Sequence, residues 1–199
     1  PIGGGIASLD HVPFAGTFDG QGHTISGLYM KSDGYYLGLF GVMAKEGMAT
    51  VKNLKLTNSY FECTRTDSLP SEVEGLGSIA GQGAGTLDTI YSDVILVNRT
   101  RNTGGLVGNL RQKDSHLTIQ NCWYDGDITG TTWMGGILGF VESNVSHTNM
   151  TDCLVTADIT STLTSGTIAI GGLSGRITAG TVASCVAVGK LTGTGNSVR

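Results

Sequence analysis

The chain is short of proline, of charge and of long apolar runs, and each shortage excludes a class of protein. Proline occurs only 3 times in 199 residues, so the abundant glycine matches neither collagen nor linker composition. Charged residues are 14 % of the chain, against about 25 % in ordinary domains, and Lys and Arg form no cluster that would neutralise the phosphates of a nucleic acid. No apolar run reaches the roughly 18 residues that a membrane-spanning helix needs.

Glycine is what the chain has in excess, at 32 residues, or about twice ordinary usage. Five copies of a short phrase end in glycine: Leu37–Gly41, Gly77–Gly81, Gly104–Gly108, Gly135–Gly139 and Gly171–Gly175. The closing glycines are 40, 27, 31 and 36 residues apart, a spacing typical of repeat architectures. We therefore predict a solenoid, in which each unit packs only on its neighbours.

A second landmark follows each phrase and consists of an apolar residue, a spacer, a small polar residue, and an apolar residue or cysteine. Its copies are Val51–Leu54, Leu87–Ile90, Ile119–Cys122, Met150–Cys153 and Val182–Cys185. A third position, six residues further on, stays apolar in every copy: Tyr60, Leu96, Ile128, Ile159 and Leu191. Such alternation, in short segments bounded by turn residues, predicts strands.

These patterns predict an all-β fold, a right-handed parallel β-helix of about five to six coils with three short strands each. We expect residues 1–199 to form one β-helix domain, with an opening segment at 1–28 and five repeats over 29–199. Pro1 is not a natural start and residues 193–199 stop where another coil should develop, so we expect a fragment of a longer protein. Leucine-rich repeats have a similar period, but their Leu-x-x-Leu-x-Leu frame is absent.

In-register stacking of the repeats predicts two core ladders. Their members are Leu39, Ile79, Leu106, Ile137 and Leu173 on one wall, and Leu54, Ile90, Cys122, Cys153 and Cys185 on another. A straight column of cysteines does not surround a tetrahedral zinc ion, and parallel in-register side chains do not approach at the angle that a disulfide requires. We therefore interpret the three cysteines as free, buried thiols.

The glycine phrases resemble the GLUG motif, a repeat of bacterial surface proteins and of the region ahead of the protease unit in some immunoglobulin A peptidases. Pro13–Leu28 is similar to the segment that commonly precedes those repeats, so the resemblance spans essentially residues 13–193. It implies a pectin-lyase-like β-helix scaffold in a bacterial, exported protein, and it brings no agreed catalytic residues. The second copy departs from the motif at Ser78 and Ala80, where we expect a local widening.

Asp127 and Asp158 are the acidic candidates for a site. Each lies five residues beyond a ladder cysteine, and Lys190 continues their column. Two carboxylates on neighbouring coils are able to act as an acid and base pair or to bind calcium. The column reads Ser59 and Ile95 in earlier coils and has no flanking arginine, which favours a solvated corner instead.

Trp123, Tyr124 and Trp133 are the aromatic candidates. Alternation directs Trp123 opposite to Cys122 and therefore out of the coil, and exposed Trp and Tyr side chains stack on sugar rings or anchor a protein partner. With Asp127 and Asp158 they form the predicted ligand-binding set. No catalytic residue, metal ligand or cofactor is predicted, because the remaining candidates, His11, His116 and His147, lie in unrelated contexts without ligand spacing.

Three functions are compatible with this sequence. The first, which we favour, is a non-catalytic extracellular module of a bacterial surface protein, a stalk or adhesin segment that binds a host protein or glycan through corner loops. The second is a polysaccharide lyase or glycosidase that uses Asp127 and Asp158, although only 12 scattered Lys and Arg residues are present to hold an acidic chain. The third is an accessory part of an immunoglobulin A peptidase. None involves nucleic acid or insertion of this segment into a membrane.

Overall fold

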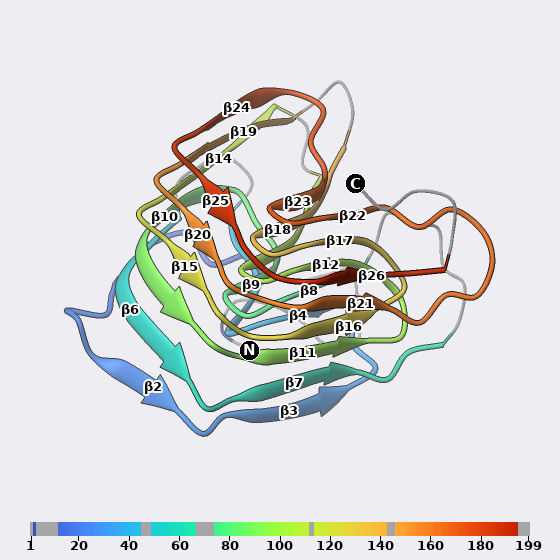
Figure 1. Cartoon of the computed structure of the whole chain (residues 1–199). Coiled ribbons are helices and arrows are strands. Elements are labelled where there is room, and N and C mark those ends of the chain that lie inside the picture. Colours follow the sequence, from blue (N-terminus) through green and yellow to red (C-terminus); the bar gives the residue numbers. More distant parts are fainter. Residues whose placement is uncertain are drawn as a thin grey trace.

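The computed structural model describes residues 2, 12–44, 49–66, 74–111, 114–142 and 146–194. Within these ranges it contains 26 strands and no helix, and thus no helix with the length and apolar character to cross a membrane. Strands from successive turns of the chain pair side by side in parallel (Figure 1). The predicted parallel β-solenoid of about five coils is confirmed.

The strands form four sheets that run the length of the solenoid. Sheet I contains β1 (Thr17–Asp19), β2 (Thr24–Ser26), β6 (Thr50–Thr57), β10 (Gly85–Ser92), β14 (Ser115–Gln120), β15 (Trp123–Tyr124), β19 (Ser146–Thr151), β20 (Leu154–Val155), β24 (Gly180–Ala183) and β25 (Val186–Ala187). Sheet II contains β3 (Tyr29–Ser32), β7 (Tyr60–Cys63), β11 (Ile95–Asn98), β16 (Ile128–Gly130), β21 (Ile159–Ser161) and β26 (Leu191–Thr192).

Sheets III and IV are shorter and flank the glycine phrases. Sheet III contains β4 (Tyr36–Leu37), β8 (Gly75–Gly77), β12 (Arg101–Gly104), β17 (Thr132–Gly135) and β22 (Ile170–Gly171). Sheet IV contains β5 (Phe40–Val42), β9 (Ala80–Gln82), β13 (Val107–Leu110), β18 (Leu138–Val141) and β23 (Ser174–Arg176). Each coil thus has four sheet positions where the sequence predicts three strands, because the phrase bends sharply and divides one wall in two.

This bend makes an arch whose tip points into the solenoid. The chain runs inward along sheet III, turns within two residues, and runs outward along sheet IV, as β22 and β23 show in Figure 1. The apolar residue of each turn is buried at the tip, with Ile79, Leu106 and Ile137 fully inaccessible. The arch therefore supplies one of the two predicted core ladders.

Glycine is required at the arch because two backbones come into contact there. A Cβ added at Gly105 would lie 1.9 Å from the carbonyl oxygen of Gly136 and 2.5 Å from the ring of Tyr124. At Gly108 it would lie 2.5 Å from the amide nitrogen of Leu76, one coil earlier. No side chain fits at Gly105 or Gly108 without displacing these atoms, whereas in the second coil the position equivalent to Gly105 holds the buried Ser78.

Both core ladders are present. Leu54, Ile90, Cys122 and Cys153 are each 2 % exposed, while Leu39, Leu173 and Cys185 are partly buried against the same core. Burial of a large apolar side chain stabilises the fold by roughly 1.5–3 kcal/mol.

The third predicted column is wrong in one coil. Phe61 takes the core position there, paired with Leu96, and Tyr60 faces outward.

A column of left-handed residues explains the small polar position of the second landmark. Asn53, Thr89, Asn121, Asp152 and Ser184 all have φ between 52° and 56°. Only glycine and short polar residues such as Asn and Asp adopt this conformation readily. Each of these residues adds an outward-facing position to sheet I, between two inward-facing ones.

The remaining fold predictions have mixed outcomes. The expected widening at Ser78 and Ala80 does not occur, because Ile79 still bonds to the carbonyl of Leu106 at 3.0 Å and the Ser78 hydroxyl bonds to the carbonyl of Gly105 at 2.5 Å. In the predicted opening segment 1–28, β1 and β2 pair with β6, while residues 1 and 3–11 lie outside the described part of the chain.

Replacing Gly105 by alanine should destabilise the protein by about 3 kcal/mol, because the added Cβ would clash with the Gly136 carbonyl and with the fully buried Tyr124 ring. Gly83→Ala is the matched control, since the nearest atom to its Cβ would be at 3.4 Å. Urea unfolding followed by circular dichroism measures both. Equal losses in the two variants would contradict the close packing at the arch.

Replacing Thr89 by asparagine should stabilise the protein by about 0.5–1 kcal/mol, because a β-branched residue is strained at its φ of 56°. Asn53→Val is the opposite change and should destabilise, since it puts a β-branched residue at φ 53°. The urea midpoints of the two variants are compared with that of the parent. A lower midpoint for Thr89→Asn would show that the column has no conformational requirement.

Candidate functional site

An aromatic row on the outer face of sheet I is the main surface feature. Lys55, Tyr91 and Trp123 lie opposite one another on β6, β10 and β15, and Leu154 and Val186 continue the row. Trp123 is 41 % exposed, whereas its neighbours Cys122 and Tyr124 face the core. The alternation that the sequence predicts at Trp123 is therefore correct.

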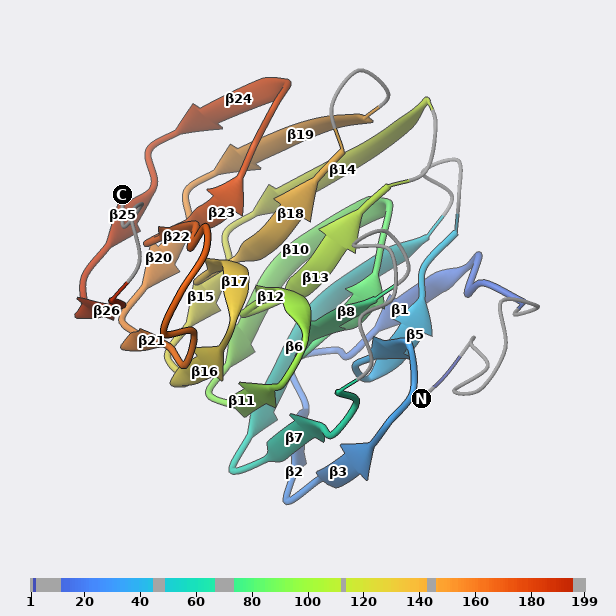
Figure 2. The same ribbon diagram turned by 90° about the vertical axis from the view of Figure 1, so that its right-hand side faces the viewer.

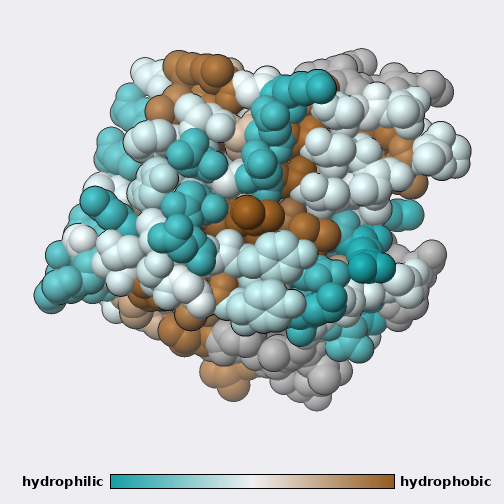
Figure 3. Space-filling model, turned by 60° about the horizontal axis from the view of Figure 1, so that its bottom comes forward, coloured by the Kyte–Doolittle hydropathy of each residue, from teal (hydrophilic) through white to brown (hydrophobic). Residues whose placement is uncertain are grey.

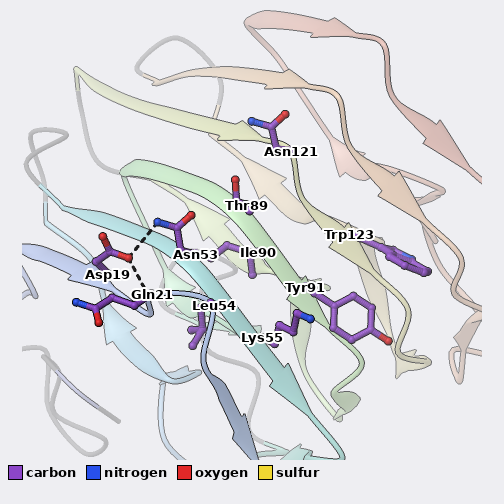
Figure 4. Close-up of a pocket in the computed structure, with 11 residues that line it drawn as sticks. Asp19, Gln21, Asn53, Leu54, Lys55, Thr89, Ile90, Tyr91, Asn121 and Trp123 are labelled. Carbon is purple, nitrogen blue, oxygen red and sulfur yellow. Dashed lines mark hydrogen bonds between the residues drawn. The ribbon is translucent and has the colours of Figure 1, made fainter.

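A polar row runs beside the aromatic row and consists of the left-handed residues Asn53, Thr89 and Asn121. Between the two rows lies a groove of about 490 Å³, which we term the outer groove (Figure 4). Leu54 and Ile90 also line the groove between the two rows, although their side chains are buried in the core. The outer groove thus runs along the solenoid axis and is open to solvent.

Hydrogen bonds fix the two aromatic rings. The Tyr91 hydroxyl donates to Oδ2 of Asp125 at 3.3 Å, and the Trp123 indole Nε1 donates to Oγ1 of Thr156 at 2.8 Å. Thr156 in turn bonds to Oδ1 of Asp125, so that one carboxylate holds both rings. The ring centroids lie 5.0 Å apart in an edge-to-face arrangement. A ligand that packs on these rings would not have to order them first.

Carboxylates at the edge of the groove are held in their charged form. The amide of Asn53 and the backbone N–H of Gln21 lower the pKa of Asp19, and the amide of Asn121 lowers the pKa of Asp88. Each asparagine uses its Nδ2 donor in this way and keeps its Oδ1 as an acceptor. Lys52 pairs with Asp19, and Lys55 lines the groove, so the edge of the groove carries charges of both signs.

Tyr124 is buried, which corrects its inclusion among the predicted ligand-binding residues. Its side chain is fully inaccessible, and its hydroxyl donates to the carbonyl oxygen of Val94 at 2.8 Å. Burial raises the pKa of this hydroxyl well above its usual value. Successive residues of a strand face opposite sides, so the outward direction of Trp123 already required that Tyr124 face inward.

Trp133 lies far from the outer groove in the fold. It belongs to β17 of sheet III and stacks on Phe140 of sheet IV, with centroids 4.7 Å apart and planes at 18°. It lines a separate cleft beside the turn from sheet II to sheet III. The structure therefore does not bring Trp123 and Trp133 together in one site.

Asp127 and Asp158 stack as predicted, on adjacent coils at the start of sheet II. Oδ1 of Asp127 accepts the backbone N–H of Asp158 at 3.2 Å, and Oδ1 of Asp158 accepts the N–H of Lys190 at 2.7 Å. Each carboxylate thus links its own coil to the next.

On the face that Figure 3 brings forward, hydrophobic areas are small and are separated by hydrophilic residues.

The cysteine ladder is aligned and its thiols are free. The Cys122 carbonyl accepts the Leu154 N–H, and the Cys153 carbonyl accepts the Val186 N–H, both at 2.9 Å. A hydrogen bond from Cys122 lowers the pKa of the Cys153 thiol to about 7, whereas burial raises that of Cys122. In the described ranges no three His, Cys, Asp or Glu side chains converge in a way that could hold a metal ion.

The histidines correct a second prediction. His116 and His147 are not in unrelated contexts, because they pair in register on β14 and β19 and their rings stack with centroids 5.4 Å apart. Their separation of 31 residues equals one coil of the solenoid. His11 lies outside the described residues.

Sequence reasoning missed most of the outer groove. Lys55 and Tyr91 occupy the position of Trp123 in earlier coils, each directly after the second landmark. This offset was available in the sequence and would have identified the aromatic row. The groove itself depends on the left-handed column beside the row, which sequence patterns indicate only as a preference for small polar residues.

Comparisons with known proteins give little further information. No family model matches the chain, and no solved structure matches it. A segment of 82 residues is 32 % identical to part of a protein of Evansella cellulosilytica (strain ATCC 21833 / DSM 2522 / FERM P-1141 / JCM 9156 / N-4) whose name reads "Putative Gly-rich membrane protein". The similar segment covers 41 % of this chain and 9 % of that protein.

Replacing Asp158 by alanine should lower stability by roughly 0.5–1 kcal/mol, because the Lys190 N–H loses its acceptor. Asp158→Asn keeps an acceptor oxygen and should cost less than half as much. Thermal unfolding of the two variants measures the difference. If Asp158→Asn lowered stability as much as Asp158→Ala, the contribution of Asp158 to stability would come from its negative charge and not from this hydrogen bond.

Proposed function

We propose that the chain is a non-catalytic, extracellular module of a bacterial surface protein and that it binds an uncharged glycan in the outer groove. The observation that carries this proposal is the pair of rings, Tyr91 and Trp123, held by one carboxylate beside a row of polar side chains. A saccharide has apolar C–H faces and a rim of hydroxyls, and this arrangement offers a surface for each.

The surface location has two supports. The glycine phrases resemble GLUG repeats of bacterial surface proteins, and the similar protein of Evansella cellulosilytica carries a name that describes a membrane protein. A stalk or adhesin segment would place the outer groove along the side of the coil, so that a chain of sugars runs parallel to the solenoid axis. The binding surface then lies on a wall of the solenoid instead of the corner loops expected from the sequence.

The charge of the groove determines the class of glycan. Asp19 pairs with Lys52 at 3.5 Å, and Lys55 lies in the aromatic row, so that positive and negative groups alternate along the edge. An uncharged saccharide pays no electrostatic penalty in such a groove. Cleavage of a polysaccharide by Asp127 and Asp158 has less support, because both carboxylates already accept backbone N–H groups.

Replacing Trp123 by alanine should weaken binding of a neutral oligosaccharide by about tenfold or more, corresponding to about 1.4 kcal/mol. A glycan array identifies the ligand and isothermal titration calorimetry measures its affinity. Tyr29→Ala is the matched control, because Tyr29 is 71 % exposed on sheet II, away from the groove. Unchanged affinity in Trp123→Ala, or an equal loss in Tyr29→Ala, would rule out the outer groove as the site.

A further inference from the structure

A second cleft lies where the chain turns from sheet II into sheet III, on the side that faces the viewer in Figure 2. We term it the corner cleft. It has a volume of about 480 Å³ and is bounded by the turn between β11 and β12, by β17, and by the loop 163–167. Its lining includes the Trp133 indole, the Arg99 and Arg101 guanidinium groups, and several Ser and Thr residues.

Hydrogen bonds hold the wall of this cleft in place. Oγ1 of Thr132 donates to the carbonyl of Thr167 at 3.0 Å and accepts the N–H of Ala169 at 3.1 Å. The Thr131 hydroxyl donates to the carbonyl of Thr100 on the neighbouring coil. The loop 163–167 is thereby tied to β17, and Trp133 packs with one ring face on Phe140.

The two guanidinium groups of the corner cleft differ in their ion pairs. Arg99 bonds to Oε1 of Glu62 at 3.2 Å, and Glu62 also pairs with Lys31 at 3.0 Å. Arg101, which is exposed, makes no ion pair with any residue in the described ranges. A guanidinium group presents paired donors that match the two oxygens of a carboxylate.

One carboxylate oxygen of Glu74 is unsatisfied at the same place. It lines the cleft, is 3 % exposed, and its Oε2 has no hydrogen-bond partner. Its backbone carbonyl accepts the side-chain amides of Asn102 and Asn109, which fixes the residue at the base of the cleft. A buried polar atom without a partner is rare in native proteins and calls for a ligand or another explanation.

Burial raises the pKa of Glu74 above its usual range, although the Arg101 N–H, a hydrogen bond from the Thr100 side chain, and the Arg101 and Arg65 charges act in the opposite direction. The other titratable groups that face it are Tyr36 and Cys63, whose pKa values burial also raises. Glu74 is therefore protonated at higher pH than an ordinary glutamate. In that state Oε2 or its proton is able to bond to a ligand without repelling a negative charge.

We propose that the corner cleft binds an acidic sugar residue, with its carboxylate on Arg101, its ring on the Trp133 indole, and a hydrogen bond from Glu74. This site is independent of the outer groove, for which we propose an uncharged ligand. The two aromatic sites of the solenoid would then bind ligands of different charge, an uncharged glycan in the outer groove and an acidic sugar in the corner cleft.

The test is isothermal titration calorimetry of the full chain with N-acetylneuraminic acid and glucuronic acid as probes, and with the methyl esters of both acids as uncharged counterparts. We expect an acid to bind at least about tenfold more tightly than its uncharged counterpart, and Arg101→Gln to remove that preference. Because Arg101 is exposed, this variant should fold as the parent does. Trp123→Ala should leave binding of the acid unchanged, which separates this site from the outer groove.

The pH dependence gives a second readout. Affinity for the acid should rise as pH falls, because Glu74 takes up its proton in this direction and does so at higher pH than an ordinary glutamate, and Glu74→Gln should bind with little dependence on pH. The proposal is wrong if the acids and their uncharged counterparts bind equally, if none binds, or if Arg101→Gln keeps the preference. Binding of the acid that persists in Arg101→Gln but disappears in Trp123→Ala would assign it to the outer groove instead.

Discussion

The close contact between backbones at the glycine arches is the constraint on which the rest of the structure depends. Each arch inserts a two-residue turn into the solenoid, with its apolar residue in the core and its glycines against the neighbouring coil. Because the backbones touch, the coils cannot shift relative to one another without a clash. The register of all four sheets follows from these contacts together with the parallel hydrogen bonds.

That fixed register gives the surface its order. When each coil repeats at the same height, residues at equivalent positions form rows along the solenoid, so that a short motif produces an extended surface. Lys55, Tyr91 and Trp123 become a row only because β6, β10 and β15 are aligned. The same alignment places Asp127 beneath Asp158 and His116 beneath His147. Variation within a row, from lysine to aromatic to aliphatic, then distinguishes one coil from the next.

The repeats predicted the parallel solenoid, both core ladders and the stack of cysteines, because each of these depends on apolar residues that recur at one position of the coil. The division of one wall into sheets III and IV was not predictable in the same way. A phrase such as Gly104–Gly108 shows that side chains are excluded, and it does not show which backbone fills the space. Likewise, Phe61 replaces Tyr60 in the core because the first complete coil is one residue longer between landmark and strand than later coils.

The sites were harder to predict than the fold. Alternation along the strand correctly predicts that Trp123 faces outward. The same rule requires Tyr124 to face inward, so its inclusion among the exposed aromatic residues was wrong. Glu74 gave no signal in the sequence, since its importance comes from burial beside Arg101 and from an oxygen without a partner. Such properties arise from coils that meet in space, and no pattern within a single repeat contains them.

Hydrogen exchange at the arch tips tests the central constraint most directly. The N–H of Leu106 bonds to the carbonyl of Ile137, and the N–H of Ile137 bonds to the carbonyl of Leu173, at 3.0 and 2.9 Å. If the arches hold the coils together, these two amides should exchange only through global unfolding, with a free energy equal to that from urea denaturation. Exchange at a markedly lower free energy, while amides of sheet I remain protected, would contradict the account.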